Sequence, residues 1–118
     1  MQPQEGDGGG SEAIDVEDVG DVTVVRPHGE MDIARATAFR QVLLTALQTE
    51  VRPHEVCVDL QHLFFCDSSG LNALLNARAV ADQTGQRLSL AAPTAQFMRL
   101  LEITGTDDLF PIEPAPPS

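Results

Sequence analysis

Residues 64–75 have the sequence FFCDSSGLNALL, an apolar run that stops at an acid and two serines and resumes at helical spacing. This change of pattern predicts the end of a strand followed by the start of a helix. The polar residues at the junction, Asp67 to Gly70, admit three explanations: a helix cap, a catalytic nucleophile, or the acceptor of a covalently attached charge. A helix needs one capping residue, so three polar side chains in a row favour more than capping.

The rest of the chain predicts alternating strands and helices. We expect strands over residues 21–29, 55–60 and 87–93, helices over 34–48, 71–85 and 94–105, and an edge strand or extended end at 108–112. This order predicts an α/β domain with a mixed, mostly parallel sheet packed with helices. Binding sites in such sheets lie where strand ends meet helix N-termini, which is where Asp67 to Gly70 fall.

The length of 118 residues fits one domain. Residues 1–12, rich in Gly, Gln and acid, predict a disordered tail; residues 13–112 form the expected domain; and residues 113–118 predict a Pro-rich C-terminal tail. The N-terminus lacks the pattern of a signal peptide, and no apolar run approaches the roughly 18 residues of a membrane span. We therefore expect a cytoplasmic protein without membrane insertion.

Composition argues against several classes of function. The chain has 18 acidic and 7 basic residues, for a net charge of −11, so we expect no nucleic acid partner. His28, His54 and His62 fit no pattern of a catalytic base or a zinc site. Cys57 and Cys66 lack CxxC spacing and are expected to be reduced and structural. We therefore expect no enzyme activity, no cofactor and no metal.

Three blocks of sequence carry a family resemblance. Residues 58–77, VDLQHLFFCDSSGLNALLNA, resemble the signature of the STAS domain, specifically that of bacterial anti-sigma factor antagonists. GEMD at residues 29–32 is similar to the family's turn before its first helix, and residues 93–112 are similar to its closing helix. The adjacent Phe64 and Phe65 depart from the family pattern, which more often has one polar residue before the Phe.

The resemblance implies a regulatory protein that is controlled by phosphorylation. It makes Ser68 the phosphate acceptor and an anti-sigma factor serine kinase the partner. The unphosphorylated chain would bind that partner and free a sigma factor, and a serine phosphatase would reverse the modification. The expected partner-binding residues are Asp32, Asp67, Ser69 and Gly70. Structural alternatives stay open, with Asp32 and Ser69 as helix caps and Gly70 as a packing residue.

A second function also stays open at this point. The chain could be a STAS regulatory subunit of a transporter, such as the small partner of a lipid-transport ABC system. The glycine pattern gives little support to a nucleotide-binding module. We expect the free chain to be a monomer.

Overall fold

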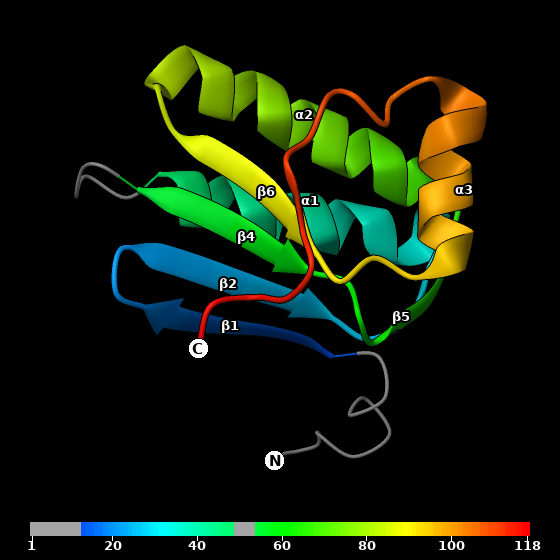
Figure 1. Cartoon of the computed structure of the whole chain (residues 1–118), viewed down its shortest axis with the longest axis horizontal. Coiled ribbons are helices and arrows are strands. Elements are labelled where there is room, and N and C mark those ends of the chain that lie inside the picture. Colours follow the sequence, from blue (N-terminus) through cyan, green and yellow to red (C-terminus); the bar gives the residue numbers. More distant parts are fainter. Residues whose placement is uncertain (1–12, 49–53) are drawn as a thin grey trace.

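The computed structural model describes residues 13–48 and 54–118, so the predicted disordered tail over residues 1–12 lies outside the described residues. The main sheet has five strands in the order β1-β2-β4-β6-β7, with β1 antiparallel to β2 and the other neighbours parallel. The predicted α/β class with a mixed, mostly parallel sheet is therefore confirmed (Figure 1). The elements in chain order are β1 (Ile14–Val19), β2 (Val22–Pro27), β3 (Gly29–Met31), α1 (Ile33–Leu47), β4 (Glu55–Asp59), β5 (Leu63–Cys66), α2 (Ser68–Thr84), β6 (Arg87–Ala91), α3 (Ala95–Thr104) and β7 (Ile112–Glu113).

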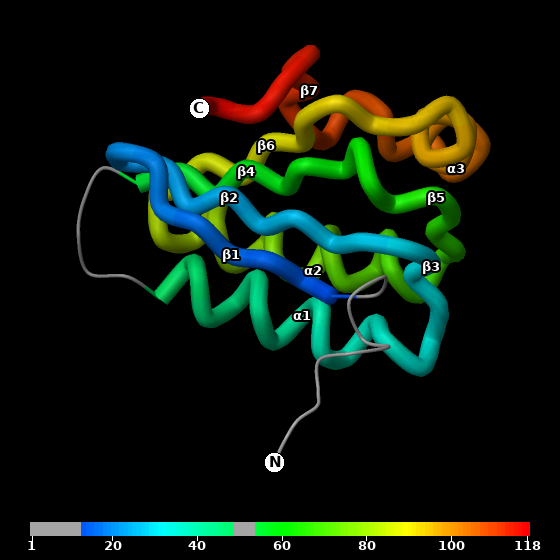
Figure 2. Tube along the Cα trace, turned by 90° about the horizontal axis from the view of Figure 1, so that it is seen from below, coloured from blue at the N-terminus to red at the C-terminus, as the bar shows by residue number. Residues whose placement is uncertain are grey.

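Helices α1 and α2 pack on one face of the sheet and run in the same direction, while α3 lies at the end of the molecule near β5 (Figures 1 and 2). The core lies between the two helices and the sheet. Within the described residues, none of the helices combines the length and the apolarity that a membrane crossing needs. The core includes Phe39, Leu43 and Leu47 of α1, Leu71, Leu74 and Ala77 of α2, and Val56, Val58, Leu88 and Leu90 of the sheet.

β1 is a strand that the sequence analysis did not predict. Its sequence, IDVEDV, alternates apolar and acidic residues, and most of its side chains are exposed. Acidic residues are depleted in strands, which weakens the local signal. The strand forms because its whole length pairs with β2 and because Arg26 of β2 binds Glu17 at 2.8 Å.

The strand predicted over residues 21–29 is divided in two. β2 ends at Pro27, and β3 begins at Gly29, whose φ of +82° lies in the left-handed region that favours glycine. β3 then leaves the main sheet and pairs with β5 in a second, two-stranded parallel sheet. The ends of β3 and β5 therefore lie next to each other.

The C-terminal segment lies against the face of the sheet that α1 and α2 leave uncovered (Figures 1 and 2). Arg87 binds both Glu55 and Glu113, at 2.8 and 2.9 Å. Residues 115–117 line a cavity of about 270 Å³ together with Cys57. These contacts were not predicted from the sequence, and the expected Pro-rich tail over residues 113–118 stays a prediction.

The packing of α3 can be tested at Leu101, which is fully buried. We expect Leu101→Ala to lower the free energy of unfolding by ~2–5 kcal/mol, because it removes buried methyl groups and leaves a cavity. Ile103, on the same helix, is 74% exposed, so Ile103→Ala is the matched control and should change stability by less than about 0.5 kcal/mol. Urea denaturation measures both. Similar losses in the two variants would show that this side chain does not anchor α3.

Candidate functional site

The ends of β3 and β5 bring two capped helix starts together. Met31 pairs with Cys66, and the backbone amide of Asp67 donates to the Met31 carbonyl oxygen at 3.1 Å. The next residues, Asp32 and Asp67, are the N-caps of α1 and α2. The structure therefore places Asp32 beside the segment that begins at Asp67, and the capping role considered for Asp32 is confirmed.

Asp67 caps α2 by binding two backbone amides in the first turn of that helix. Its Oδ1 accepts from the backbone N–H of Ser69 at 2.9 Å and from that of Gly70 at 3.4 Å. The helix consequently begins at Ser68, three residues before the predicted start at Leu71. The capping role considered for Ser69 is wrong, because Asp67 takes that position and Ser69 lies in the first turn.

Ser68 is the first residue of α2 and its side chain is exposed. In the part of the chain that the structure describes, its hydroxyl makes no hydrogen bond and no histidine bonds to it. A serine nucleophile needs an adjacent general base, so this arrangement is not that of an activated nucleophile. An exposed hydroxyl at the start of a helix is instead accessible to another protein.

Gly70 is buried where α2 crosses β3 and β5. A Cβ atom at this position would lie 2.5 Å from the Sγ of Cys66 and 2.7 Å from the Cγ of Met31. Both distances are too short for atoms that do not share a bond, so glycine lets the helix approach the strands this closely. This contact supports the packing role; partner binding by Gly70 stays a prediction.

Gln96 of α3 positions the strand that leads to Ser68. Its Oε1 accepts from the backbone N–H of Cys66, and its Nε2 donates to the Cys66 carbonyl oxygen, both at 2.9 Å. The amide thus pairs with the outer edge of β5 as a neighbouring strand would. Sequence reasoning missed this residue, because a Gln in the first turn of an amphipathic helix carries no signal of a distant partner.

Exposed apolar side chains lie in the two segments that flank the junction. Ile33, the first residue of α1, is 78% exposed, and Phe64 and Phe65 of β5 are 72% and 44% exposed. We call Asp32, these three residues and Ser68 the Ser68 surface. Apolar residues gathered on an exposed surface mark an interaction site. The surface is therefore suited to protein docking.

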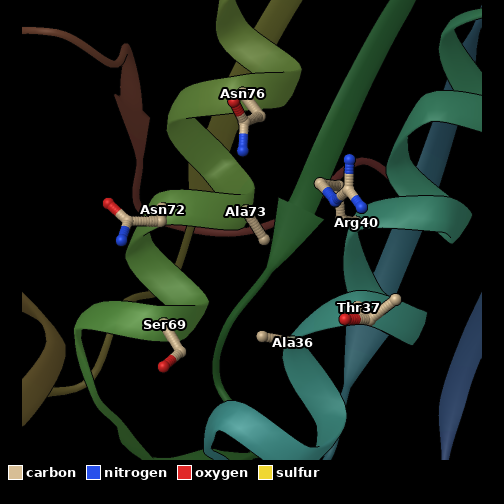
Figure 3. Close-up of a pocket in the computed structure, with 7 residues that line it drawn as sticks. All are labelled: Ala36, Thr37, Arg40, Ser69, Asn72, Ala73 and Asn76. Carbon is tan, nitrogen blue, oxygen red and sulfur yellow. The ribbon is translucent and has the colours of Figure 1, made fainter.

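A groove of about 230 Å³ separates α1 from α2 next to this surface (Figure 3). The small residues Ala36 and Ala73, one from each helix, leave the space open. No group of three His, Cys, Asp or Glu side chains within residues 13–48 and 54–118 is placed to hold a metal ion. The remaining lining residues are Thr37 and Arg40 of α1 and Ser69, Asn72 and Asn76 of α2.

Both cysteines are free and buried, in agreement with the predicted structural role. Burial and, to a smaller extent, the nearby Asp67 carboxylate raise the pKa of the Cys66 thiol to about 12. Burial also raises the pKa of Cys57. The thiolate is the reactive form of cysteine, so neither side chain is a reactive group near neutral pH.

Comparisons with known proteins converge on one family. A family model described as "Mlab, STAS domain" matches residues 14–112. The Anti-sigma F factor antagonist of Paenibacillus polymyxa is 29% identical over 99 residues, which cover 84% of each chain. The Anti-sigma-B factor antagonist of Staphylococcus epidermidis is 28% identical over 85 residues, 72% of this chain and 77% of the relative. The crystal structure of an anti-sigma factor antagonist from Mycobacterium paratuberculosis has a TM-score of 0.73 at 28% identity, covering 87% of this chain and 86% of that one.

The raised thiol pKa values predict a loss of stability at alkaline pH. Above the ordinary thiol pKa of 9.0 and up to about 12, unfolded chains lose the Cys66 proton while folded chains keep it. The free energy of unfolding should therefore fall as pH rises through this window. The chain has no Tyr and no Lys, so few other groups titrate there. Denaturation measured across this pH range should show a smaller decline in the free energy of unfolding for Cys66→Ala than for the wild-type chain. An equal decline in the two proteins would contradict the raised pKa of Cys66.

The close approach at Gly70 predicts a specific double-mutant result. Gly70→Ala should lower the free energy of unfolding by ~1–3 kcal/mol, because the new methyl group overlaps Cys66 and Met31. Cys66→Ala removes one of the overlapping atoms, so the double variant should lose less than the sum of the two single losses. Guanidinium chloride denaturation of the four proteins measures this coupling. Additive losses would mean that the two residues are not in contact.

Proposed function

Because the chain belongs to the STAS domain family, we propose that it is an anti-sigma factor antagonist that binds an anti-sigma factor serine kinase and so frees a sigma factor. Relatives named for antagonism of anti-sigma factors align with most of this chain and with most of their own length. The Ser68 surface supports the proposal, because it offers exposed apolar residues and no catalytic group for a reaction of its own.

Phosphorylation of Ser68 by the partner switches the antagonist off in this proposal. The observation that carries it is the position of Ser68, whose exposed hydroxyl stands at the first residue of α2 within the Ser68 surface. A phosphoryl group on this oxygen adds a charge of about −1.5 to −2 at neutral pH. A serine phosphatase would then restore the unmodified form.

The charge should act on binding more than on folding. Asp67 already holds the amides of Ser69 and Gly70, so a phosphate gains from the helix dipole, on the order of 0.3–1 kcal/mol, without displacing the cap. Repulsion by the Asp67 carboxylate opposes this gain, so the fold should persist. In the complex, a dianion covered by the partner at the Ser68 surface would lose its hydration, which costs several kcal/mol without new partners.

The remaining site residues take supporting roles in the proposal. Asp32 is exposed beside Ser68 and would contact the partner directly. Asp67 and Ser69 would shape the surroundings of the Ser68 hydroxyl, and Gly70 would keep the start of α2 close to the strands. The antagonist would act in the cytoplasm and be a monomer when free.

The first test identifies the partner and the modified residue. The chain is used as bait in lysate of its native host, and bound proteins are identified while the intact mass of the bait is measured. Recovery of an anti-sigma factor supports the proposal; recovery of an ABC transporter subunit would instead support the alternative of a transporter regulator.

The switch itself is tested with variants of the two serines. With the recovered kinase and ATP, we expect wild-type chain and Ser69→Ala to gain one phosphate and Ser68→Ala to gain none while still binding. Ser68→Asp should fold, judged by circular dichroism, and bind about ten- to a thousandfold more weakly, because each ~1.4 kcal/mol of interface penalty is a tenfold loss. Phosphate on Ser69, or tight binding by Ser68→Asp, would refute the assignment.

A further inference from the structure

We propose that the groove between α1 and α2 holds an acidic side chain of the protein partner, with Arg40 as its receptor. The inference rests on the proposed function, because it takes this partner to be the protein that covers the Ser68 surface. It adds a contact that the sequence motif does not include, on a helix face away from the serine.

Arg40 is a cation that has no partner among the described residues of this acid-rich protein. Acidic residues outnumber basic ones by 18 to 7, and Arg26, Arg78 and Arg87 each bind a carboxylate of this chain. Arg40 is half-buried, yet in the part of the chain that the structure describes it makes no hydrogen bond or ion pair. Its guanidinium is therefore available to a carboxylate from outside.

The groove around Arg40 is rich in hydrogen-bond donors. Figure 3 shows Arg40 extending from α1 toward α2, where Asn76 and Ala73 lie across from it. A guanidinium presents donors in a fork that matches a carboxylate, and the amide of Asn76 adds two more N–H groups. Thr37 supplies a hydroxyl. The groove thus suits an Asp or Glu side chain in both charge and donors.

The groove is continuous with the Ser68 surface. Ser69, Asn72 and Asn76 line it at spacings of three and four residues, so they form one stripe along α2 that begins beside Ser68. A partner that covers Ser68 can therefore reach Arg40 without a gap in the contact. Arg40 lies across from Asn76, eight residues or ~12 Å along α2 from Ser68, so a phosphate on Ser68 is largely screened from the bound carboxylate and the groove is a separate contact.

The test compares arginines in different settings. Arg99 of α3 also lacks a hydrogen bond or ion pair within the described residues, but it is exposed and lies outside the groove, so Arg99→Ala is the matched control. Calorimetric titration with the recovered anti-sigma factor should show about 10- to 100-fold weaker binding for Arg40→Ala and a smaller loss for Arg40→Lys. Arg99→Ala should bind within about twofold of wild type. Unchanged melting temperatures verify that each variant is folded.

A double variant separates a groove contact from a general effect of charge. Because the groove contact lies about two helical turns from Ser68, the losses of affinity caused by Ser68→Asp and by Arg40→Ala should add in the double variant. Wild-type affinity of Arg40→Ala, or a double variant that binds no more weakly than Ser68→Asp alone, overturns the inference. In either case phosphorylation of Ser68 and release of the partner would remain intact, so the proposed function would stand.

A partner-free experiment tests the groove if no anti-sigma factor is recovered. The peptide acetyl-Glu-Glu-Glu-amide is titrated into ¹⁵N-labelled full chain while the side-chain signals of Arg40 and Asn76 are followed by NMR. We expect saturable shifts of both signals, which disappear in Arg40→Ala and do not occur with the corresponding tri-lysine peptide. Absence of these shifts overturns the inference, whatever the identity of the partner.

Discussion

The arrangement at Ser68 depends on the parallel pairing of β3 with β5. With Met31 opposite Cys66, both strands end at the same level, and the helices that follow begin next to each other. Two parallel helices bring their positive ends together, which is unfavourable unless negative groups are placed there. Asp32 and Asp67, each at a helix start, supply that charge. Asp32 and Asp67 therefore stabilise the helix starts, in addition to any part they take in binding.

Capping by Asp67 makes the start of α2 independent of the proposed phosphorylation site. Its carboxylate occupies the amides of the first turn, so the helix start is complete without Ser68. The Ser68 hydroxyl has no hydrogen bond among the described residues and can change its charge without breaking a contact of the folded chain. Gln96 holds the preceding strand, β5, through the backbone of Cys66, so the position of the start of α2 does not depend on the Ser68 side chain. A side chain that makes no stabilising contact in the folded chain can be modified without loss of the fold.

The parts of this fold that sequence predicts are those with local causes. The helix over residues 94–105 was predicted with its Thr94 and Gly105 ends because caps and apolar spacing are contained in the segment. β1 was missed because its acidic residues are uncommon in strands, and because the strand forms only by pairing with β2. Ser68 came from a family resemblance, whereas Arg40 and Gln96 become visible only when distant helices and strands are brought together. Sequence spacing carries no record of such contacts.

The tight packing at Gly70 has a consequence for how this motif should vary among relatives. A side chain there would collide with Cys66 and Met31, so replacement of the glycine endangers folding in every member with this geometry. Ser68, by contrast, can be exchanged at little cost to the fold. Natural selection should therefore retain the glycine wherever the domain survives, and the serine where a phosphate-controlled switch is in use. In genome surveys, the glycine would identify the architecture and the serine would identify the regulated members.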